Sequence, residues 1–235
     1  MNIAILLSGG TGSRLGSDIP KQYIEVNGKM IITYSLEVLC KHKDIDGIVI
    51  VVADEWKVRV EEVVKNLTSE AGVFFAKPGD NRQLSIYSAL EAIKLFLADA
   101  SQSDLSSLNV FIHDAARPNL TSEMITSYLG AMEGHDGVLP VLPMKDTVYY
   151  SQDGKQVSNL LDRSKVFAGQ APEVFNFQKY YSACKALLPD KILTINGSTE
   201  PAILAGMDIA MVPGDENNYK ITTKADLVKF ENSLK

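Results

Sequence analysis

Short apolar runs alternate with helix-like segments over the first 140 residues, and this alternation constrains the fold more than any other feature of the chain. Apolar strands separated by amphipathic helices are typical of a mostly parallel sheet with helices on both faces. We therefore expect an α/β fold. The expected strands are Asn2–Ser8, Gly47–Ala53, Gly72–Ala76, Asn109–His113 and Gly137–Pro140, and the expected helices are Met30–His42, Glu55–Thr68, Gln83–Ala98 and Thr121–Glu133.

The pattern changes after Val141. Val148–Tyr150 and Val157–Leu160 flank the turn-forming letters SQDGK, which predicts a β-hairpin. Because this hairpin is rich in polar residues, we expect it to project as an arm at about 142–170 from a single domain over 1–235. Beyond the arm, the expected elements are strands at Ile192–Ile195 and Ile209–Val212 and a helix over Ala225–Leu234.

Composition excludes several classes of protein. The chain has 235 residues, 46% of them hydrophobic, so it can bury a sizeable core. Its net charge of -6 argues against a nucleic-acid partner, because such proteins normally present a basic face. Cys40 and Cys184 have neither metal-ligand spacing nor a disulfide framework, so we expect reduced thiols in the cytoplasm. The N-terminal apolar run is too short for a signal peptide or a membrane span, so no membrane partner is expected.

A glycine-rich loop follows the first expected strand. After Leu7 and Ser8 come Gly9, Gly10, Thr11 and Gly12, at the carboxyl end of that strand, where open α/β sheets bind ligands. Glycines let successive backbone amides approach a phosphate closely. The alternative is an ordinary tight turn, but the density and position of the glycines favour phosphate binding. The spacing matches neither a dinucleotide fingerprint nor a P-loop.

Two cations, Arg14 and Lys21, follow the loop. A triphosphate needs both a chelating cation and a point charge, since negative charge builds on the bridging oxygen as pyrophosphate leaves. Either residue alone would be interpreted as a solvated surface cation. Together, beside the glycine loop, they favour a nucleoside triphosphate.

Two further motifs carry polar side chains. In GDNRQLSI, Gly79 and Asp80 form a turn, and Arg82 and Ser85 share one face of a starting helix. These groups suit the edge of a nucleobase, and a helix N-cap with a solvated arginine explains them equally well. In HDAARP, Asp114 directly follows an apolar strand, where a carboxylate is well placed to hold a divalent cation on phosphate oxygens.

Several other positions are weaker signals. Arg117 lies in the rigid loop after Asp114, and His113 is interpreted as a structural hydrogen-bonding residue. Thr147, Arg163 and Lys220 stand in polar segments but carry little weight alone, because most such residues face solvent.

Taken together, the motifs resemble the family of cytidylyltransferases that act on polyol phosphates. The motifs occur in order between Ala4 and Leu227: GGTGSRLG with PKQY, GDNRQLSI, HDAARP, PMKDT, DRSKVFAGQAPEVF and NNYKITT. The resemblance implies a Rossmann-like, GT-A-like nucleotidyltransferase fold. It also implies transfer of CMP from CTP to a polyol phosphate with Mg²⁺, release of pyrophosphate, and a homodimer joined through the arm.

The resemblance assigns roles to individual residues. Arg14, Lys21 and Lys220 would be the catalytic cations, and Asp114 would hold the metal beside the acceptor. Arg163 would enter the neighbouring subunit's site. The nucleotide is expected on Leu7, Ser8, Gly9, Gly10, Thr11, Gly12, Gly79, Asp80, Arg82 and Ser85, and the acceptor on Asp114, Arg117, Thr147 and Arg163.

The chain departs from the family's pattern at three places, of which the first lies near the expected acceptor site. The family usually has Gln-Thr-Pro-Gln where this chain has Gln170–Glu173, and a Thr-Asp-Glu segment where it has Thr194–Pro201. Asn217 replaces a frequent aspartate, with Asp215 or Glu216 as possible substitutes.

The departures leave the acceptor open. We expect 2-C-methyl-D-erythritol 4-phosphate first, with ribitol 5-phosphate or another alditol phosphate as the alternative. A sugar-1-phosphate nucleotidyltransferase and a non-catalytic nucleotide-binding protein are the other hypotheses.

Overall fold

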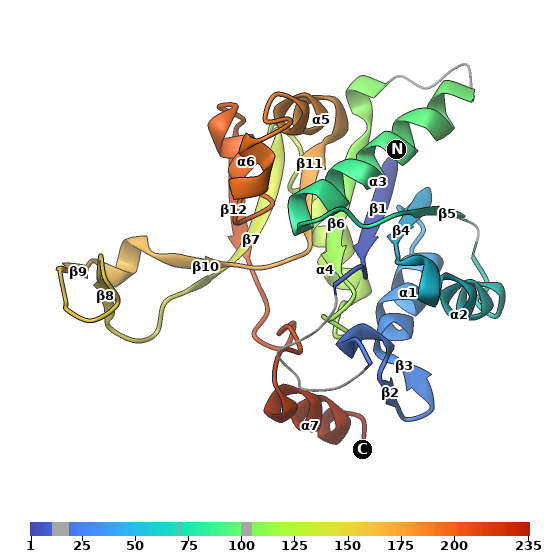
Figure 1. Cartoon of the computed structure of the whole chain (residues 1–235), viewed down its shortest axis with the longest axis horizontal. Coiled ribbons are helices and arrows are strands. Elements are labelled where there is room, and N and C mark those ends of the chain that lie inside the picture. Colours follow the sequence, from blue (N-terminus) through green and yellow to red (C-terminus); the bar gives the residue numbers. More distant parts are fainter. Residues whose placement is uncertain (11–18, 70, 100–104) are drawn as a thin grey trace.

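An eight-stranded sheet forms the centre of the molecule in the computed structural model, with strand order β10-β7-β11-β6-β1-β4-β5 and β12 paired to β7 (Figure 1). The structure describes residues 1–10, 19–69, 71–99 and 105–235. In the main sheet the strands are β1 (Asn2–Leu7), β4 (Gly47–Val51), β5 (Gly72–Ala76), β6 (Asn109–Asp114), β7 (Gly137–Pro143), β10 (Phe167–Gly169), β11 (Glu173–Asn176) and β12 (Ile209–Pro213). The helices are α1 (Ile31–Lys41), α2 (Asp54–Lys65), α3 (Arg82–Asp99), α4 (Ser122–Gly130), α5 (Phe177–Lys185), α6 (Glu200–Leu204) and α7 (Lys224–Ser233).

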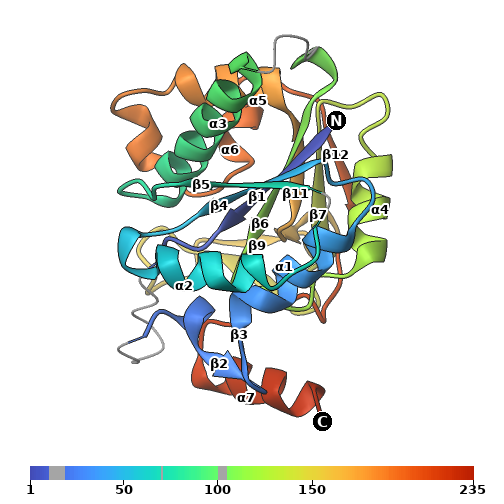
Figure 2. The same cartoon turned by 90° about the vertical axis from the view of Figure 1, so that its right-hand side faces the viewer.

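Parallel pairing dominates the middle of the sheet. β1 pairs in parallel with both β4 and β6, and β4 pairs in parallel with β5. Every residue of β4 is buried, as is usual for a strand covered on both faces. Helices α1, α2 and α4 cover one face of the sheet, and α3, α5 and α6 cover the other (Figure 2). The prediction of a mostly parallel α/β fold with helices on both faces is confirmed.

Strand order reverses on the two sides of β1. The chain places β4 and β5 on one side of β1 and then crosses to place β6 on the other. A crevice opens at the carboxyl ends of neighbouring strands where the order reverses in this way, and ligands of open α/β sheets bind there. Gly9, Gly10 and Asp114 lie at this point, because the two glycines follow β1 and Asp114 ends β6.

Two parts of the sheet differ from the sequence prediction. The strand expected at Ile192–Ile195 is wrong, because Lys191–Thr194 forms a single 3-10 turn. Ile192 is buried, whereas Leu193 is 53% exposed, so this short apolar run anchors a loop instead of entering the sheet. β10 and β11 were not predicted. β10 pairs antiparallel with β7, and β11 runs antiparallel between β6 and β7 and so joins them in one sheet.

The predicted hairpin is confirmed. β8 (Val148–Tyr150) and β9 (Asn159–Leu161) pair antiparallel, with Val148 opposite Leu161. The hairpin projects from the body between β7 and β10, with a 3-10 turn at Arg163–Lys165 on its return (Figure 1). Tyr149 and Leu160 are 59% and 60% exposed, so the arm presents apolar side chains to its surroundings.

A small second layer holds the C-terminal helix. Phe230 of α7 packs with Val26, Ile31 and Ile221, beside the short hairpin of β2 (Glu25–Val26) and β3 (Lys29–Met30). Thr223 begins α7 with a capping box, so the segment directly before the helix, which carries Lys220, is held in place. None of the helices in the described ranges is long and apolar enough to cross a membrane.

Candidate active site

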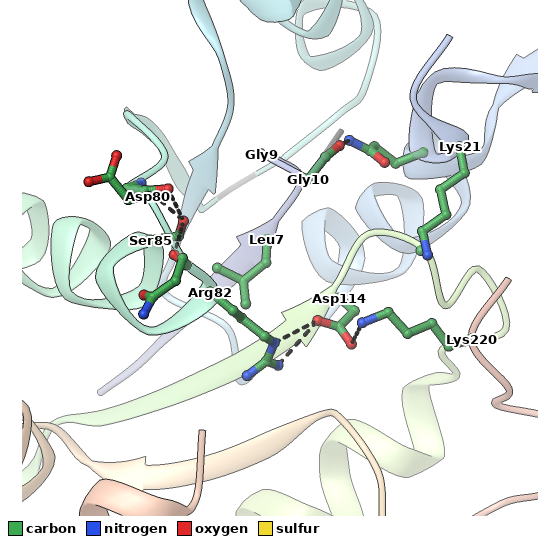
Figure 3. A pocket seen from close by; sticks show the side chains of 13 residues that line it. Leu7, Gly9, Gly10, Lys21, Asp80, Arg82, Ser85, Asp114 and Lys220 are labelled. Atoms are coloured by element: carbon green, nitrogen blue, oxygen red, sulfur yellow. Dashed lines mark hydrogen bonds and ion pairs between the residues drawn. The ribbon is translucent and has the colours of Figure 1, made fainter. Parts of the chain in front are cut away.

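A pocket of about 450 Å³ opens at the carboxyl edge of the sheet. The loops after β1, β5 and β6 form it, together with the 3-10 turn Lys21–Tyr23 and the segment before α7. Figure 3 shows Arg82 and Lys220 approaching Asp114 from opposite sides, while Lys21 extends toward the same space. The residues that line the pocket are Leu7, Gly9, Gly10, Lys21, Gln22, Gly79, Asp80, Asn81, Arg82, Ser85, Asp114, Ala116 and Lys220.

The glycine loop meets the loop after β5 at close range. A Cβ atom on Gly9 would lie 2.4 Å from the Pro78 Cβ, and one on Gly79 would lie 2.4 Å from the Leu84 Cβ. Neither position therefore has room for a side chain. The two glycines let two backbone segments line one wall of the pocket together, as a phosphate-binding wall requires.

Lys21 reaches the pocket from a turn that is tied to the glycine loop. The side-chain amide of Gln22 donates hydrogen bonds to the carbonyl oxygens of Ser8 and Gly10, at 2.6 and 2.7 Å. The Tyr23 hydroxyl donates to the Ser8 carbonyl oxygen at 2.8 Å, and the Tyr23 ring stacks on Trp56. Gln22 and Tyr23, the next two residues of the turn, are buried, so they fix the backbone position of Lys21.

Ser85 shapes the turn expected to contact a nucleobase. Its hydroxyl accepts a hydrogen bond from the Gly79 amide at 3.0 Å and donates to the Asn81 carbonyl oxygen at 2.9 Å. Asn81 begins α3 by accepting from the Leu84 amide at 2.7 Å. Asp80 is exposed at the rim of the pocket, so its backbone and carboxylate are accessible to a ligand.

Asp114 is the buried carboxylate at the pocket floor, and three cations surround it. Arg82 donates to its Oδ1 at 3.1 and 3.3 Å, and Lys220 donates to its Oδ2 at 2.9 Å. The Nε of Arg117 lies 3.6 Å from the same Oδ2. Burial acts to raise the pKa of Asp114, but Arg82, Lys220 and Arg117 outweigh burial and hold that pKa well below its usual range. Asp114 is therefore ionised at neutral pH.

Behind the floor, His113 and Arg117 brace the loop after β6. His113 is fully buried, and its Nε2 lies 3.0 Å from the Arg117 carbonyl oxygen and 3.3 Å from the Ser35 hydroxyl. Burial lowers the pKa of His113 to about 4, so its ring is neutral at pH 7. Arg117 donates to the Asn218 carbonyl oxygen at 2.6 Å. The interpretation of His113 as a structural residue is confirmed.

The remaining predicted residues lie elsewhere. Ser8 is buried beneath the pocket and donates to the Val51 carbonyl oxygen. Arg117 lies beside the floor, outside the lining. Thr147 and Arg163 are exposed on the arm, where Arg163 donates to the Lys145 carbonyl oxygen. Thr11, Gly12 and Arg14 lie outside the described residues.

Sequence reasoning missed three lining residues, Gln22, Asn81 and Ala116. Each stands inside one of the motifs described above, but the site was assigned mainly to the charged residues of those motifs. Glu173, which ends the departure from the family's pattern at Gln170–Glu173, was not among the predicted site residues. Its buried carboxylate lies 3.8 Å from Arg82. Of the possible substitutes for Asn217, Glu216 pairs with Lys145, and the Asp215 backbone is bonded to Gln170.

The arrangement suits a large, strongly anionic ligand. Among the residues that the structure describes, three cationic side chains line the pocket: Lys21, Arg82 and Lys220. The net charge of the chain is -6. Backbone amides of the glycine loops adjoin these side chains, and such groups together stabilise phosphate charge that builds up during group transfer. In the described part of the chain, no group of three or more His, Cys, Asp or Glu side chains is placed to hold a metal ion.

Comparisons with known proteins agree with the geometry. A model of the family described as IspD, 2-C-methyl-D-erythritol 4-phosphate cytidylyltransferase, matches residues 2–235. A 2-C-methyl-D-erythritol 4-phosphate cytidylyltransferase from Neorickettsia sennetsu is 34% identical, over 98% of this chain and 95% of its own length. A ribitol-5-phosphate cytidylyltransferase from Streptococcus agalactiae is 29% identical, over 98% of this chain and 94% of its own.

Solved structures agree on the fold. The crystal structure of 4-diphosphocytidyl-2C-methyl-D-erythritol synthase from Anaerococcus prevotii superposes with a TM-score of 0.81 at 22% sequence identity. The match covers 99% of this chain and 95% of that one. The expected nucleotidyltransferase-type fold is therefore confirmed.

Proposed function

This chain belongs to the 2-C-methyl-D-erythritol 4-phosphate cytidylyltransferase family, and from that premise we propose that it transfers CMP from CTP to 2-C-methyl-D-erythritol 4-phosphate. The products are a CDP-polyol and pyrophosphate. The observation that carries the proposal is the convergence of Lys21, Arg82 and Lys220 on one pocket, beside Gly9 and Gly10, at the point where strand order reverses.

The chemistry follows from the charges. A phosphate oxygen of the acceptor attacks the α-phosphorus of CTP and forms a new oxygen–phosphorus bond. The bond from the α-phosphorus to the bridging oxygen breaks, and its electron pair leaves with pyrophosphate. Because the nucleophile is already an anion, no general base is needed. The protein's task is to hold two anions in line and to neutralise the charge that develops on the bridging oxygen.

The residues divide this work by position. The amides near Gly9 and Gly10 and the ammonium group of Lys21 suit the triphosphate, because they form the wall after β1. The turn of Gly79 and Ser85 is the part proposed to contact cytosine. Lys220 lies against Asp114, on the side of that carboxylate opposite Arg82, and is assigned to the reacting phosphates.

We also propose Mg²⁺ as the divalent cation of the reaction. Both oxygens of Asp114 already meet cations, so the described side chains do not form a magnesium site by themselves. Phosphate oxygens are the hard ligands that Mg²⁺ prefers, and the nucleotide would therefore bring most of the coordination shell.

A homodimer joined through the arm is part of the proposal. The arm ends in exposed apolar side chains, including Tyr149 and Leu160, which a partner subunit would cover. Arg163 lies on the arm and is absent from the pocket lining of its own chain. Its assigned role at the acceptor therefore requires the neighbouring subunit. A cytoplasmic location stays a prediction.

Ribitol 5-phosphate is the second candidate acceptor, because a relative named ribitol-5-phosphate cytidylyltransferase matches 98% of the chain. The test is pyrophosphate release with CTP and each acceptor separately. We expect turnover with CTP and 2-C-methyl-D-erythritol 4-phosphate, and little with UTP, GTP or ATP. Turnover with ribitol 5-phosphate alone would move the assignment to the second acceptor. If CTP released no pyrophosphate with any polyol phosphate, the proposed function would be wrong.

A further inference from the structure

Glu173 is a buried carboxylate that does not line the pocket. It begins β11, and its side chain is 8% exposed. The Thr199 hydroxyl donates to its Oε1 at 2.7 Å, and the Ser198 hydroxyl donates to its Oε2. Ser198 and Thr199 are themselves buried, so the carboxylate is clamped by the segment directly before α6.

The clamped carboxylate faces Arg82. Oε2 of Glu173 lies 3.8 Å from Nη2 of Arg82, and that same Nη2 lies 3.1 Å from Oδ1 of Asp114. Glu173 stands opposite Ile112 in the pairing of β11 with β6, and Asp114 lies two residues further along β6. Both carboxylates therefore project from the same face of the sheet.

Arg82 is held from its buried side and open on the other. Its side chain is 34% exposed and lines the pocket, whereas the side chains of Asp114 and Glu173 are 9% and 8% exposed. A guanidinium is a rigid planar fork with five N–H groups. Fixing the fork with two buried carboxylates also fixes the N–H groups that remain for a ligand.

A second contact supports the N-terminal end of α3, where Arg82 lies. The side-chain amide of Asn81 donates to the Ile192 carbonyl oxygen at 3.0 Å. The segment from Ile192 to Thr199 thus braces the start of α3 both directly, through Asn81, and through Glu173 on Arg82.

We propose that Glu173 is a positioning residue for the transfer reaction: it holds the Arg82 guanidinium, together with Asp114, in the orientation that meets the phosphates. The proposal rests on the proposed function. Glutamine at 173 would still satisfy both hydroxyls, since a hydroxyl either donates or accepts. It would remove the negative charge facing Arg82, and leave Arg82 held by Asp114 alone.

The test compares Glu173→Gln with wild type at pH 8, because burial raises the pKa of Glu173 and an alkaline pH favours its ionised form. Because Arg82 would be misoriented in the transition state, we expect kcat to fall about tenfold, with KM for CTP within about twofold. Glu91→Gln is the matched control: Glu91 is also on α3 but bonds Tyr87 and Tyr181, and its kinetics should equal those of wild type. An unchanged kcat with a lower KM for CTP would overturn the proposal, because Glu173 would then only reduce the pocket's positive charge.

A double-mutant cycle separates positioning from a structural role. In an Arg82→Lys background, Glu173→Gln should lower kcat by less than about twofold, since lysine has no fork to orient. A further tenfold loss in that background would overturn the proposal. If Glu173→Gln does not fold, Thr199→Val keeps the charge and removes one hydroxyl bond, and the same coupling to Arg82→Lys is expected. Failure of wild type with every polyol phosphate would instead refute the proposed function.

Discussion

Gln22 is tied to Ser8 across fourteen residues of sequence, through a hydrogen bond of 2.6 Å from its side-chain amide to the Ser8 carbonyl oxygen. The same amide bonds the Gly10 carbonyl oxygen. These contacts occupy the carbonyl groups of Ser8 and Gly10 with one side-chain amide. They also fix the turn that carries Lys21, so one buried side chain aligns the loop amides with the adjacent cation.

We predict that Gln22→Ala weakens both stability and turnover. Loss of two hydrogen bonds at a buried site should lower the free energy of unfolding by about 2 kcal/mol. Because the loop and Lys21 would lose their common anchor, kcat/KM should also fall by about tenfold or more. Urea denaturation and pyrophosphate release measure the two effects. Wild-type turnover in a destabilised Gln22→Ala protein would show that the anchor has no role in alignment.

Unlike Gln22→Ala, Lys21→Ala should lower turnover strongly and leave stability almost unchanged. Lys21 is half-buried at the pocket, and its proposed work is done on charge that develops at the bridging oxygen. We expect turnover to fall by about three orders of magnitude and stability to change by less than about 0.5 kcal/mol. Lys77→Ala is the control, since Lys77 is an exposed cation paired with Asp54. A Lys21→Ala enzyme with near-native turnover would contradict the role assigned to Lys21.

The parallel half of the fold could be predicted because each element carries a local signal. β4 and β5 are continuous apolar runs, and α4 lies within the expected helix Thr121–Glu133, with Thr121 as its N-cap. The pocket's location followed from the same signals, since Gly9 and Gly10 follow β1 and Asp114 ends β6.

The clamp on Arg82 could not be predicted, because its partners are distant in sequence and weakly patterned. Glu173 begins a strand of four residues, which is too short to show alternation. The contacts of Asn81 with Ile192 and of Glu173 with Thr199 depend on tertiary packing. The sequence around Arg82 does not distinguish a guanidinium held by two carboxylates from a solvated one.

Arg163 should act in the partner's site if the arm joins two subunits. We predict that Arg163→Ala and Lys21→Ala homodimers are each nearly inactive. Unfolding and refolding an equal mixture should restore activity, because half of the dimers would be mixed and each mixed dimer would hold one intact site. A mixture of two Lys21→Ala preparations is the control and should stay inactive. Absence of recovery, with mixed dimers confirmed by mass, would place Arg163 outside the neighbour's site.

Asp226 should make the stability of α7 depend on pH. Burial acts to raise the pKa of Asp226, but hydrogen bonds from the amides and hydroxyls of Thr222 and Thr223 outweigh it and bring that pKa to about 2. An unfolded aspartate has a pKa of about 3.9, so the capping bonds stabilise the protein above pH ~4 and are lost as pH falls toward 2. Asp226→Asn should therefore lower the free energy of unfolding by about 1 kcal/mol at pH 7, with a smaller difference at pH 3. Urea denaturation at both pH values measures it, with Glu231→Gln on the same helix as the control. An Asp226→Asn deficit of equal size at pH 7 and pH 3 would mean that the carboxylate charge does not hold the cap.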